Sequence, residues 1–162
     1  MSAYFEDIEI GSELVLGSHA FTADGIIRFA EKFDPQPFHL SEEAAQKTHF
    51  GRLCASGWHT ASAYMRLNVL KNQELDELNR QQGKPVARFG PSPGFEDLKW
   101  LRPVFAGDTI TYKRVVTGKT ESKSRPKWGL VHGQNYGINQ DGETVFSFKS
   151  TVFVERQTAA SE

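Results

Sequence analysis

The spacing of apolar residues along the chain changes from a helical period in the first half to a period of two in the second. Apolar positions recur at helical spacing over residues 22–33, where Thr22 is placed to cap a helix. Asp34-Pro35 should end this helix, because a residue before proline is disfavoured in the α region. Ser41 is placed to cap a second, short helix. The first half is therefore predicted to be mainly helical.

The longest helical pattern begins at Gly57 and runs to about residue 70, or on to Asn79 before Gly83 and Pro85 stop it. Its apolar residues cover most of the circumference: Trp58, Ala61, Ala63, Tyr64, Met65, Leu67, Val69 and Leu70. A helix that is apolar nearly all round is typical of a buried helix. We therefore expect a long central helix, with Trp58, Tyr64 and Met65 more often core than pocket.

Alternating patterns after this helix predict strands at residues 86–89, 98–101, 109–116, 127–138 and 143–154, and an earlier strand lies within 11–21. Asp141-Gly142 is a hairpin turn between the last two. No stretch has the composition of a linker. The chain is predicted to be one α+β domain over residues 1–162, with an antiparallel sheet wrapped round the long helix.

Composition narrows the function classes. The 162 residues carry 19 Lys and Arg against 20 Asp and Glu, so the basic surplus typical of a nucleic-acid binder is missing. No apolar run is long enough to span a membrane, and the first ten residues lack the pattern of a secretory signal. The single cysteine, Cys54, excludes an internal disulfide. We expect a cytoplasmic protein that binds neither nucleic acid nor membrane.

The segment most suited to chemistry is Asp34-Pro35-Gln36-Pro37-Phe38-His39. Its two prolines fix the backbone of a short loop that presents a carboxylate, an amide and an imidazole. Ser56-Gly57 then opens the long helix, whose first N–H groups have no internal partner and lie at the positive end of the helix dipole. A glycine there lets a ligand approach the backbone closely.

These groups suit the addition of water to a double bond conjugated to a carbonyl. That reaction needs a base for the water, an acid for the α-carbon and donors for the enolate-like oxygen. Asp34 and His39 can hold one water between them, and the Gly57 N–H can hold the oxygen. No metal is required. His49 and His59 do not have the spacing of zinc ligands.

The spacing Asp34-x-Gln36-Pro37-Phe38-His39, followed by Ala55-Ser56-Gly57, resembles the hydratase motif of the MaoC-like dehydratases, which include the (R)-specific enoyl-CoA hydratases. Residues 101–108 resemble a strand connection of the same family. The chain departs from the usual motif at Gln36, where the family has asparagine, and at Phe33, where it has a small residue.

The resemblance implies a hot-dog fold and a homodimer, or a larger oligomer built from it, with two sheets joined edge to edge. It implies an acyl thioester of coenzyme A or an acyl carrier as substrate, an (R)-3-hydroxy product and no separate cofactor. Asp34 and His39 take the positions of the catalytic pair, and Gly57 that of the amide that polarises the thioester carbonyl. Gln36, Ser56 and Trp58 are candidate substrate-binding residues.

Alternatives remain open at this stage. Asp34 can simply cap a turn, His39 can be a surface residue, and Gly57 can serve helix–sheet packing. The chain can also be a hot-dog thioesterase or a non-catalytic acyl-thioester-binding subunit. Cys54 is expected to be a small packing residue and His59 a satisfied, partly buried histidine. The candidates for contact with the phosphates of coenzyme A are not ranked: Arg52, Arg88, Arg102 and the basic residues 119–127.

Overall fold

The computed structural model describes residues 3–157. A short 3-10 turn, Phe5–Asp7, precedes the strand β1, Glu13–Ala20. Four helices and four strands follow: α1 Ala23–Phe33, α2 Pro37–Leu40, α3 Glu42–Gln46, α4 Gly57–Gln81, β2 Gly94–Trp100, β3 Thr109–Glu121, β4 Trp128–Ile138 and β5 Thr144–Glu155.

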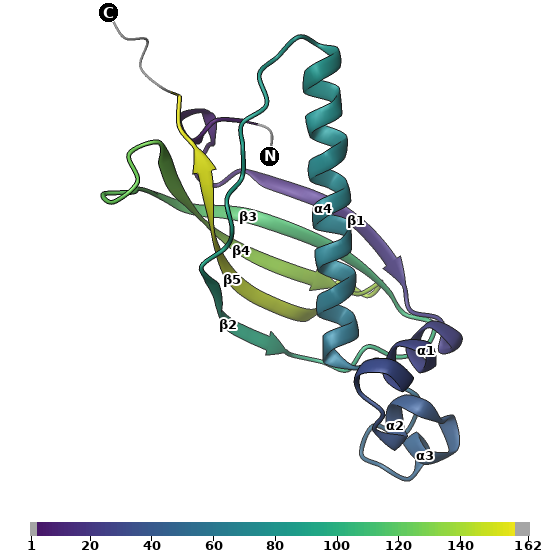
Figure 1. The fold of residues 1–162 in the computed structure, drawn as a ribbon. Coiled ribbons are helices and arrows are strands. Elements are labelled where there is room, and N and C mark those ends of the chain that lie inside the picture. Colours follow the sequence, from purple (N-terminus) through teal and green to yellow (C-terminus); the bar gives the residue numbers. More distant parts are fainter. Residues whose placement is uncertain (1–2, 158–162) are drawn as a thin grey trace, which may run out of the picture.

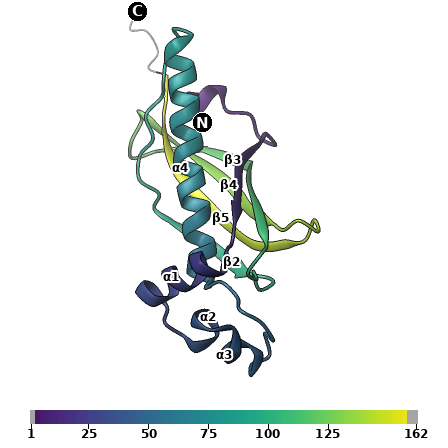
Figure 2. The same cartoon turned by 90° about the vertical axis from the view of Figure 1, so that its right-hand side faces the viewer.

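The strands form one antiparallel sheet in the order β1-β3-β4-β5-β2. The sheet curves round α4, which crosses one of its faces (Figure 1). The short helices α1, α2 and α3 gather at the N-terminal end of α4 (Figure 2). The α+β class and the antiparallel sheet round a long helix are as the sequence predicts. Only β3, β4 and β5 form a meander, because β2 returns to the far edge beside β5.

Side chains of alternate strand residues pack beneath α4 and fix its position. The principal core cluster joins Phe21 and Ile26 to Tyr112, Val145 and Phe146, all buried almost completely. The Tyr112 hydroxyl donates a 2.9 Å hydrogen bond to the carbonyl of Thr60 in the first turns of α4. The start of α4 is therefore held against the middle of the sheet.

Local signals in the sequence are confirmed at several helix ends and at one turn. Thr22, Ser41 and Ser56 each accept a hydrogen bond from a backbone N–H as N-caps of α1, α3 and α4. The hairpin between β4 and β5 turns at Gly142, whose φ of +80° suits glycine. The helix α4 extends to Gln81, slightly beyond the longer of the two predicted limits.

The predicted strand at residues 86–89 is wrong. This segment makes only an isolated bridge between Phe89 and Val154, where its chain runs beside the end of β5. Pro85 and Pro91 flank it and carry no N–H to extend a ladder, so too few consecutive residues remain for a strand.

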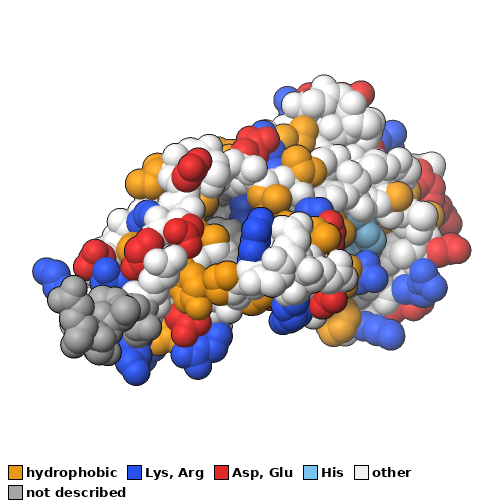
Figure 3. All heavy atoms as spheres, turned by 90° about the horizontal axis from the view of Figure 1, so that it is seen from above, with side chains coloured by type: hydrophobic (Ala, Val, Ile, Leu, Met, Phe, Trp, Pro, Cys, Tyr) orange, Lys and Arg blue, Asp and Glu red, His pale blue; other side chains and the backbone are white. Residues whose placement is uncertain are grey.

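Two further expectations need correction. Trp58 and Met65 are each 53% exposed and do not belong to the core, because within one chain the sheet covers only one side of α4. Apolar side chains accordingly reach the surface among charged ones (Figure 3). His39, expected on a loop, lies on the helical turn α2, which begins at Pro37, a residue favoured at the first helical position.

Tyr64 and Asn135 provide a test of how α4 is fixed to the sheet. The Tyr64 hydroxyl donates to Oδ1 of Asn135, which is fully buried. Tyr64→Phe leaves this oxygen without its donor, so we expect the free energy of unfolding to fall by about 1–3 kcal/mol in urea titrations. Tyr136→Phe is the control, since no hydrogen bond of its hydroxyl occurs among the described residues. Equal effects of the two substitutions would contradict the expectation.

Candidate active site

Three predicted catalytic residues meet in one pocket. Asp34 follows the last turn of α1, His39 lies on α2, and Gly57 begins α4. All three line a cavity of about 380 Å³, which is closed on its other side by Trp100 and the segment after it. Residues far apart in sequence are thus brought to the N-terminal end of the long helix.

The carboxylate of Asp34 is held at both oxygens. The Ser56 hydroxyl donates to Oδ2 at 2.7 Å, and Nε2 of Gln36 donates to Oδ1 at 2.8 Å. Burial raises the pKa of Asp34, but these two hydrogen bonds and, when the imidazole is protonated, the charge of His39 outweigh it and lower the pKa below its ordinary value. Asp34 is therefore ionised at neutral pH and able to accept a proton.

His39 is only 6% exposed and faces this carboxylate. Its Nδ1 lies 2.7 Å from the carbonyl oxygen of Cys54, and a carbonyl can only accept, so Nδ1 carries the proton. The other ring nitrogen, Nε2, lies 3.5 Å from Oδ2 of Asp34. This tautomer leaves the Nε2 lone pair directed at the space beside the carboxylate. A water molecule there can be held by both groups.

Cys54 contributes its backbone and not its thiol. Burial raises the pKa of the Cys54 thiol to about 11, so a thiolate is disfavoured. The sulfur packs 3.8 Å from Nδ1 of His39, as expected of a small packing residue. The useful group is the carbonyl, which fixes the tautomer and orientation of the imidazole.

Gly57 begins α4 and lines the pocket. The next three backbone N–H groups are already bonded to Ser56: that of Trp58 to its hydroxyl, and those of His59 and Thr60 to its carbonyl. Gly57 is the first helical residue, so its N–H has no acceptor inside the helix. A Cβ at this position would overlap the indole ring of Trp100, whose Nε1 donates a 2.8 Å hydrogen bond to the Gly57 carbonyl. Close packing against Trp100 therefore requires glycine here.

The three predicted substrate-binding residues divide into two groups. The side chains of Gln36 and Ser56 each donate a hydrogen bond to Asp34, so they position its carboxylate. Trp58 is half exposed at the rim, with its ring edge-on to Trp100 at 5.1 Å between centroids. The sequence prediction missed Trp100. An aromatic residue at the end of a predicted strand is too common a pattern to indicate a site residue.

His59 lies outside this pocket and differs from its prediction. Its ring stacks on Phe29, with 4.5 Å between centroids, and its buried Nδ1 has no hydrogen-bond partner. Burial, aided by the nearby His19, lowers the pKa of His59 to about 4. It is a neutral member of an aromatic cluster and is not a fully satisfied histidine.

The candidate phosphate-binding cations differ in their distance from the pocket. Arg102 lines it, and Arg52 lies close by with its guanidinium 4.0 Å from the ring centroid of Phe105. Arg88 is paired with Glu155 at the end of β5. The loop between β3 and β4, which carries most of the basic residues 119–127, lies at the opposite end of the sheet from α1–α3 (Figure 1).

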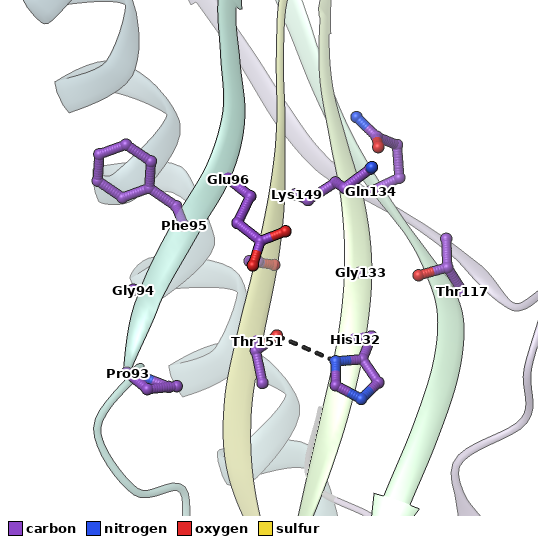
Figure 4. Close-up of a pocket in the computed structure, with 11 residues that line it drawn as sticks. Pro93, Gly94, Phe95, Glu96, Thr117, His132, Gly133, Gln134, Lys149 and Thr151 are labelled. Atoms are coloured by element: carbon purple, nitrogen blue, oxygen red, sulfur yellow. Dashed lines mark hydrogen bonds between the residues drawn. The ribbon is translucent and has the colours of Figure 1, made fainter.

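A larger cavity, about 640 Å³, lies on the sheet face away from α4 (Figure 4). Two of its polar side chains already have partners: Nδ1 of His132 lies 3.0 Å from Oγ1 of Thr151, and Lys149 is paired with Asp97 at 2.7 Å. Among the described residues, no carboxylate forms an ion pair with the imidazole of His132. The pocket at the start of α4 is therefore the better candidate for chemistry.

Residues 9–131 match the MaoC-like domain, and the chain belongs to this family. It is 42% identical to 3-hydroxybutyryl-CoA dehydratase of Methylorubrum extorquens, over 88% of this chain and 82% of that protein. It is 35% identical to mesaconyl-CoA hydratase of Cereibacter sphaeroides, over 98% of this chain, and spans 43% of that longer protein. The solved MaoC-like dehydratase of Rhodospirillum rubrum superposes with a TM-score of 0.77 at 34% identity, covering 97% of this chain and 99% of that one.

The fold is accordingly the hot-dog fold that the resemblance implied. Within residues 3–157 no group of three or more His, Cys, Asp or Glu side chains is arranged to hold a metal ion. Over the same range, no helix is both long enough and apolar enough to cross a membrane.

Ser56→Ala tests how the charge on Asp34 is maintained. The substitution removes a hydrogen bond that lowers the pKa of Asp34, so we expect that pKa to rise, measured by NMR titration of the side-chain carboxyl carbon. Ser41→Ala, which removes an N-cap hydroxyl from α3, should leave it unchanged. An unmoved Asp34 titration in Ser56→Ala would contradict the assignment.

Proposed function

We propose that the protein is a hydratase that adds water reversibly to the double bond of a 2-enoyl thioester to give a 3-hydroxyacyl thioester. We also propose that residues 1–162 form one hot-dog domain and that no cofactor is needed beyond the coenzyme A of the substrate. The observation that carries the proposal is the pairing of Nε2 of His39 with the ionised Asp34 at 3.5 Å, in the pocket where α4 begins.

In this proposal the water lies between Asp34 and His39, donating one proton to each. Asp34 accepts a proton as the water oxygen bonds to C3, and the electrons of the double bond move toward the thioester oxygen. The Gly57 N–H, at the positive end of α4, stabilises the charge on that oxygen. C2 then takes a proton from the Asp34–His39 pair, which returns to its starting state. Since one pair serves both steps, water adds to one face of the double bond.

The two alternative functions are less well supported. A thioesterase would direct the water at the carbonyl carbon, whereas the well-covered relative with 42% identity is named as a 3-hydroxybutyryl-CoA dehydratase. A non-catalytic subunit has no need of an acid–base pair, yet here Asp34 has two donors and His39 a fixed tautomer.

The position of the thioester carrier follows from the charges near the pocket. Arg102 lines the cavity and Arg52 lies beside the same segment, so these two are our candidates for the phosphates of coenzyme A. Arg88 and Arg102 both have an ion-pair partner, Glu155 and Glu143 respectively, so the choice rests on the position of Arg102 at the cavity. An acyl carrier protein would present a single phosphate to the same residues. The cytoplasmic setting expected from the sequence remains a prediction.

The proposed homodimer joins two sheets through β2. This strand is an edge of the sheet, so one side of its backbone has no partner strand among the described residues. Phe95, Trp100 and Leu101 are 58%, 44% and 51% exposed, and they would be covered by a second copy. The β2 edge also adjoins the pocket through Trp100.

Substitution of the catalytic pair tests the mechanism. Asp34→Asn and His39→Ala should each lower kcat by about 10²–10⁴-fold, because each removes a group that moves or orients the water proton. Loss of enoyl-CoA absorbance measures the rate, and circular dichroism checks the fold. Asp24→Asn, at the exposed start of the same helix α1, is the matched control. Near wild-type rates in both site variants would rule out the mechanism.

Sedimentation equilibrium tests the association. We expect a particle of twice the chain mass, because the edge of β2 and its exposed apolar side chains need a partner. Release of free thiol is followed on the same sample, and its absence during hydration separates a hydratase from a thioesterase. A monomer with full hydratase activity would contradict the proposed β2 interface.

A further inference from the structure

A third cavity lies on the α4 side of the sheet, between the middle of the helix and strands β2 to β5. Its volume is about 510 Å³. Most of its lining is apolar and includes Met65, Phe89, Phe95, Val131, Phe148 and Val152. In Figure 4, Phe95 lies on the side of β2 next to the helix, whereas Glu96 and Lys149 project from the other face. The cavity is thus an apolar space distinct from the polar hollow on the outer face.

One cationic side chain enters this apolar space. Arg114, on β3, donates from Nη1 to Oδ1 of Asn68 at 2.7 Å and from Nη2 to Oδ1 of Asn72 at 3.0 Å. These bonds use two of the five guanidinium donors. Burial lowers the pKa of Arg114, which shows that the charge is poorly solvated.

Arg114 has no ion-pair partner in the part of the chain that the structure describes. Among residues 3–157 it takes part in no ion pair, and Asn68 and Asn72 are neutral acceptors. A charge removed from water is costly unless an opposite charge pairs with it. A bridge from β3 to α4 needs only a neutral donor, so the positive charge exceeds what that structural role requires. An anion from outside the chain would complete the site.

We infer that this cavity receives a carboxylate at the far end of the acyl group, so that the preferred substrate is an enoyl thioester carrying a second carboxylate, which pairs with Arg114. The inference rests on the proposed hydratase function and names the substrate class within it. An apolar cavity with one unpaired cation matches an acyl chain that is apolar along its length and anionic at its end.

The proposed dimer brings the two cavities together. Within one chain, Asn68 lies about 16 Å along α4 from Gly57, at 1.5 Å per residue, so the Arg114 cavity is remote from the site of water addition. Antiparallel pairing of β2 with its copy, about a two-fold axis through the middle of the strand, places Trp100 of one protomer opposite Gly94 of its partner. Trp100 lines the catalytic pocket, and Gly94 lines the Arg114 cavity. This pairing would set each catalytic pocket beside the Arg114 cavity of the other protomer.

The test compares two substrate series on the intact protein: 2-enoyl-CoA thioesters of increasing length that end in a carboxylate, and the same chains ending in a methyl group. Wild-type protein should show a higher kcat/KM for the carboxylate at one chain length. Arg114→Met should lower that kcat/KM by about 10- to 100-fold, the loss expected for hydrogen bonds to a charged group, with little change for the methyl series. Lys113→Met removes the same charge from the opposite face of β3 and should change neither series.

A second variant keeps the arginine and supplies its counter-ion. Asn68→Asp places a carboxylate at the 2.7 Å contact with Nη1, so it should preserve or raise the melting temperature while abolishing the preference for the carboxylate series. This variant remains informative if Arg114→Met fails to fold.

The outcomes separate the inference from the function on which it rests. Hydration of both series with no preference for a carboxylate overturns the inference and leaves the hydratase standing. An equal loss of both series in Arg114→Met shows that Arg114 is only a structural brace. Failure to hydrate either series at any length overturns the proposed function and, with it, the inference.

Discussion

The hydroxyl of Ser56 joins the start of α4 to the acidic residue of the site. It accepts from the backbone N–H of Trp58 as the helix cap and donates to Oδ2 of Asp34. One side chain therefore fixes both the first turn of α4, where the Gly57 N–H has no acceptor inside the helix, and the carboxylate beside it. The distance between the proposed base and the proposed oxyanion donor depends on this link. Because Ser56 is almost fully buried, water does not compete for it.

The rigid segment before α4 completes the arrangement from the other side. Pro37 starts the short turn α2, and this turn carries His39 back to the carbonyl of Cys54. The imidazole is thus tied to the chain just before Ser56, while Asp34 is tied to Ser56 itself. Both proposed catalytic groups are therefore held in position by the same few residues at the start of α4. Such pre-organisation is what general acid–base chemistry requires, since small displacements of either group are costly.

The sequence predicts what depends on neighbours in the chain and misses what depends on neighbours in space. The caps at Thr22 and Ser41 and the turn at Gly142 follow from local backbone chemistry and are confirmed. The pairing of Asp34 with His39 was found through a motif of six residues. The role of Gln36 was not, because an amide can face substrate or carboxylate equally well until the fold sets its direction. The burial of Trp58 was overestimated. An apolar helix face has the same sequence pattern whether its own sheet or a second chain covers it.

Asp34 and Arg114 show how differently a protein can treat a charge that is partly removed from water. Asp34 is surrounded by donors from its own chain, so its charge is stabilised whether or not a ligand is present. Arg114 has only neutral acceptors, and three of its donors have no partner within residues 3–157. A group that takes a proton from bound water must be ionised and oriented before the substrate arrives, which explains the two donors around Asp34. A group left incomplete by its own chain gains most when an opposite charge arrives, and this gain is the physical basis on which a cavity selects an anionic ligand over a neutral one.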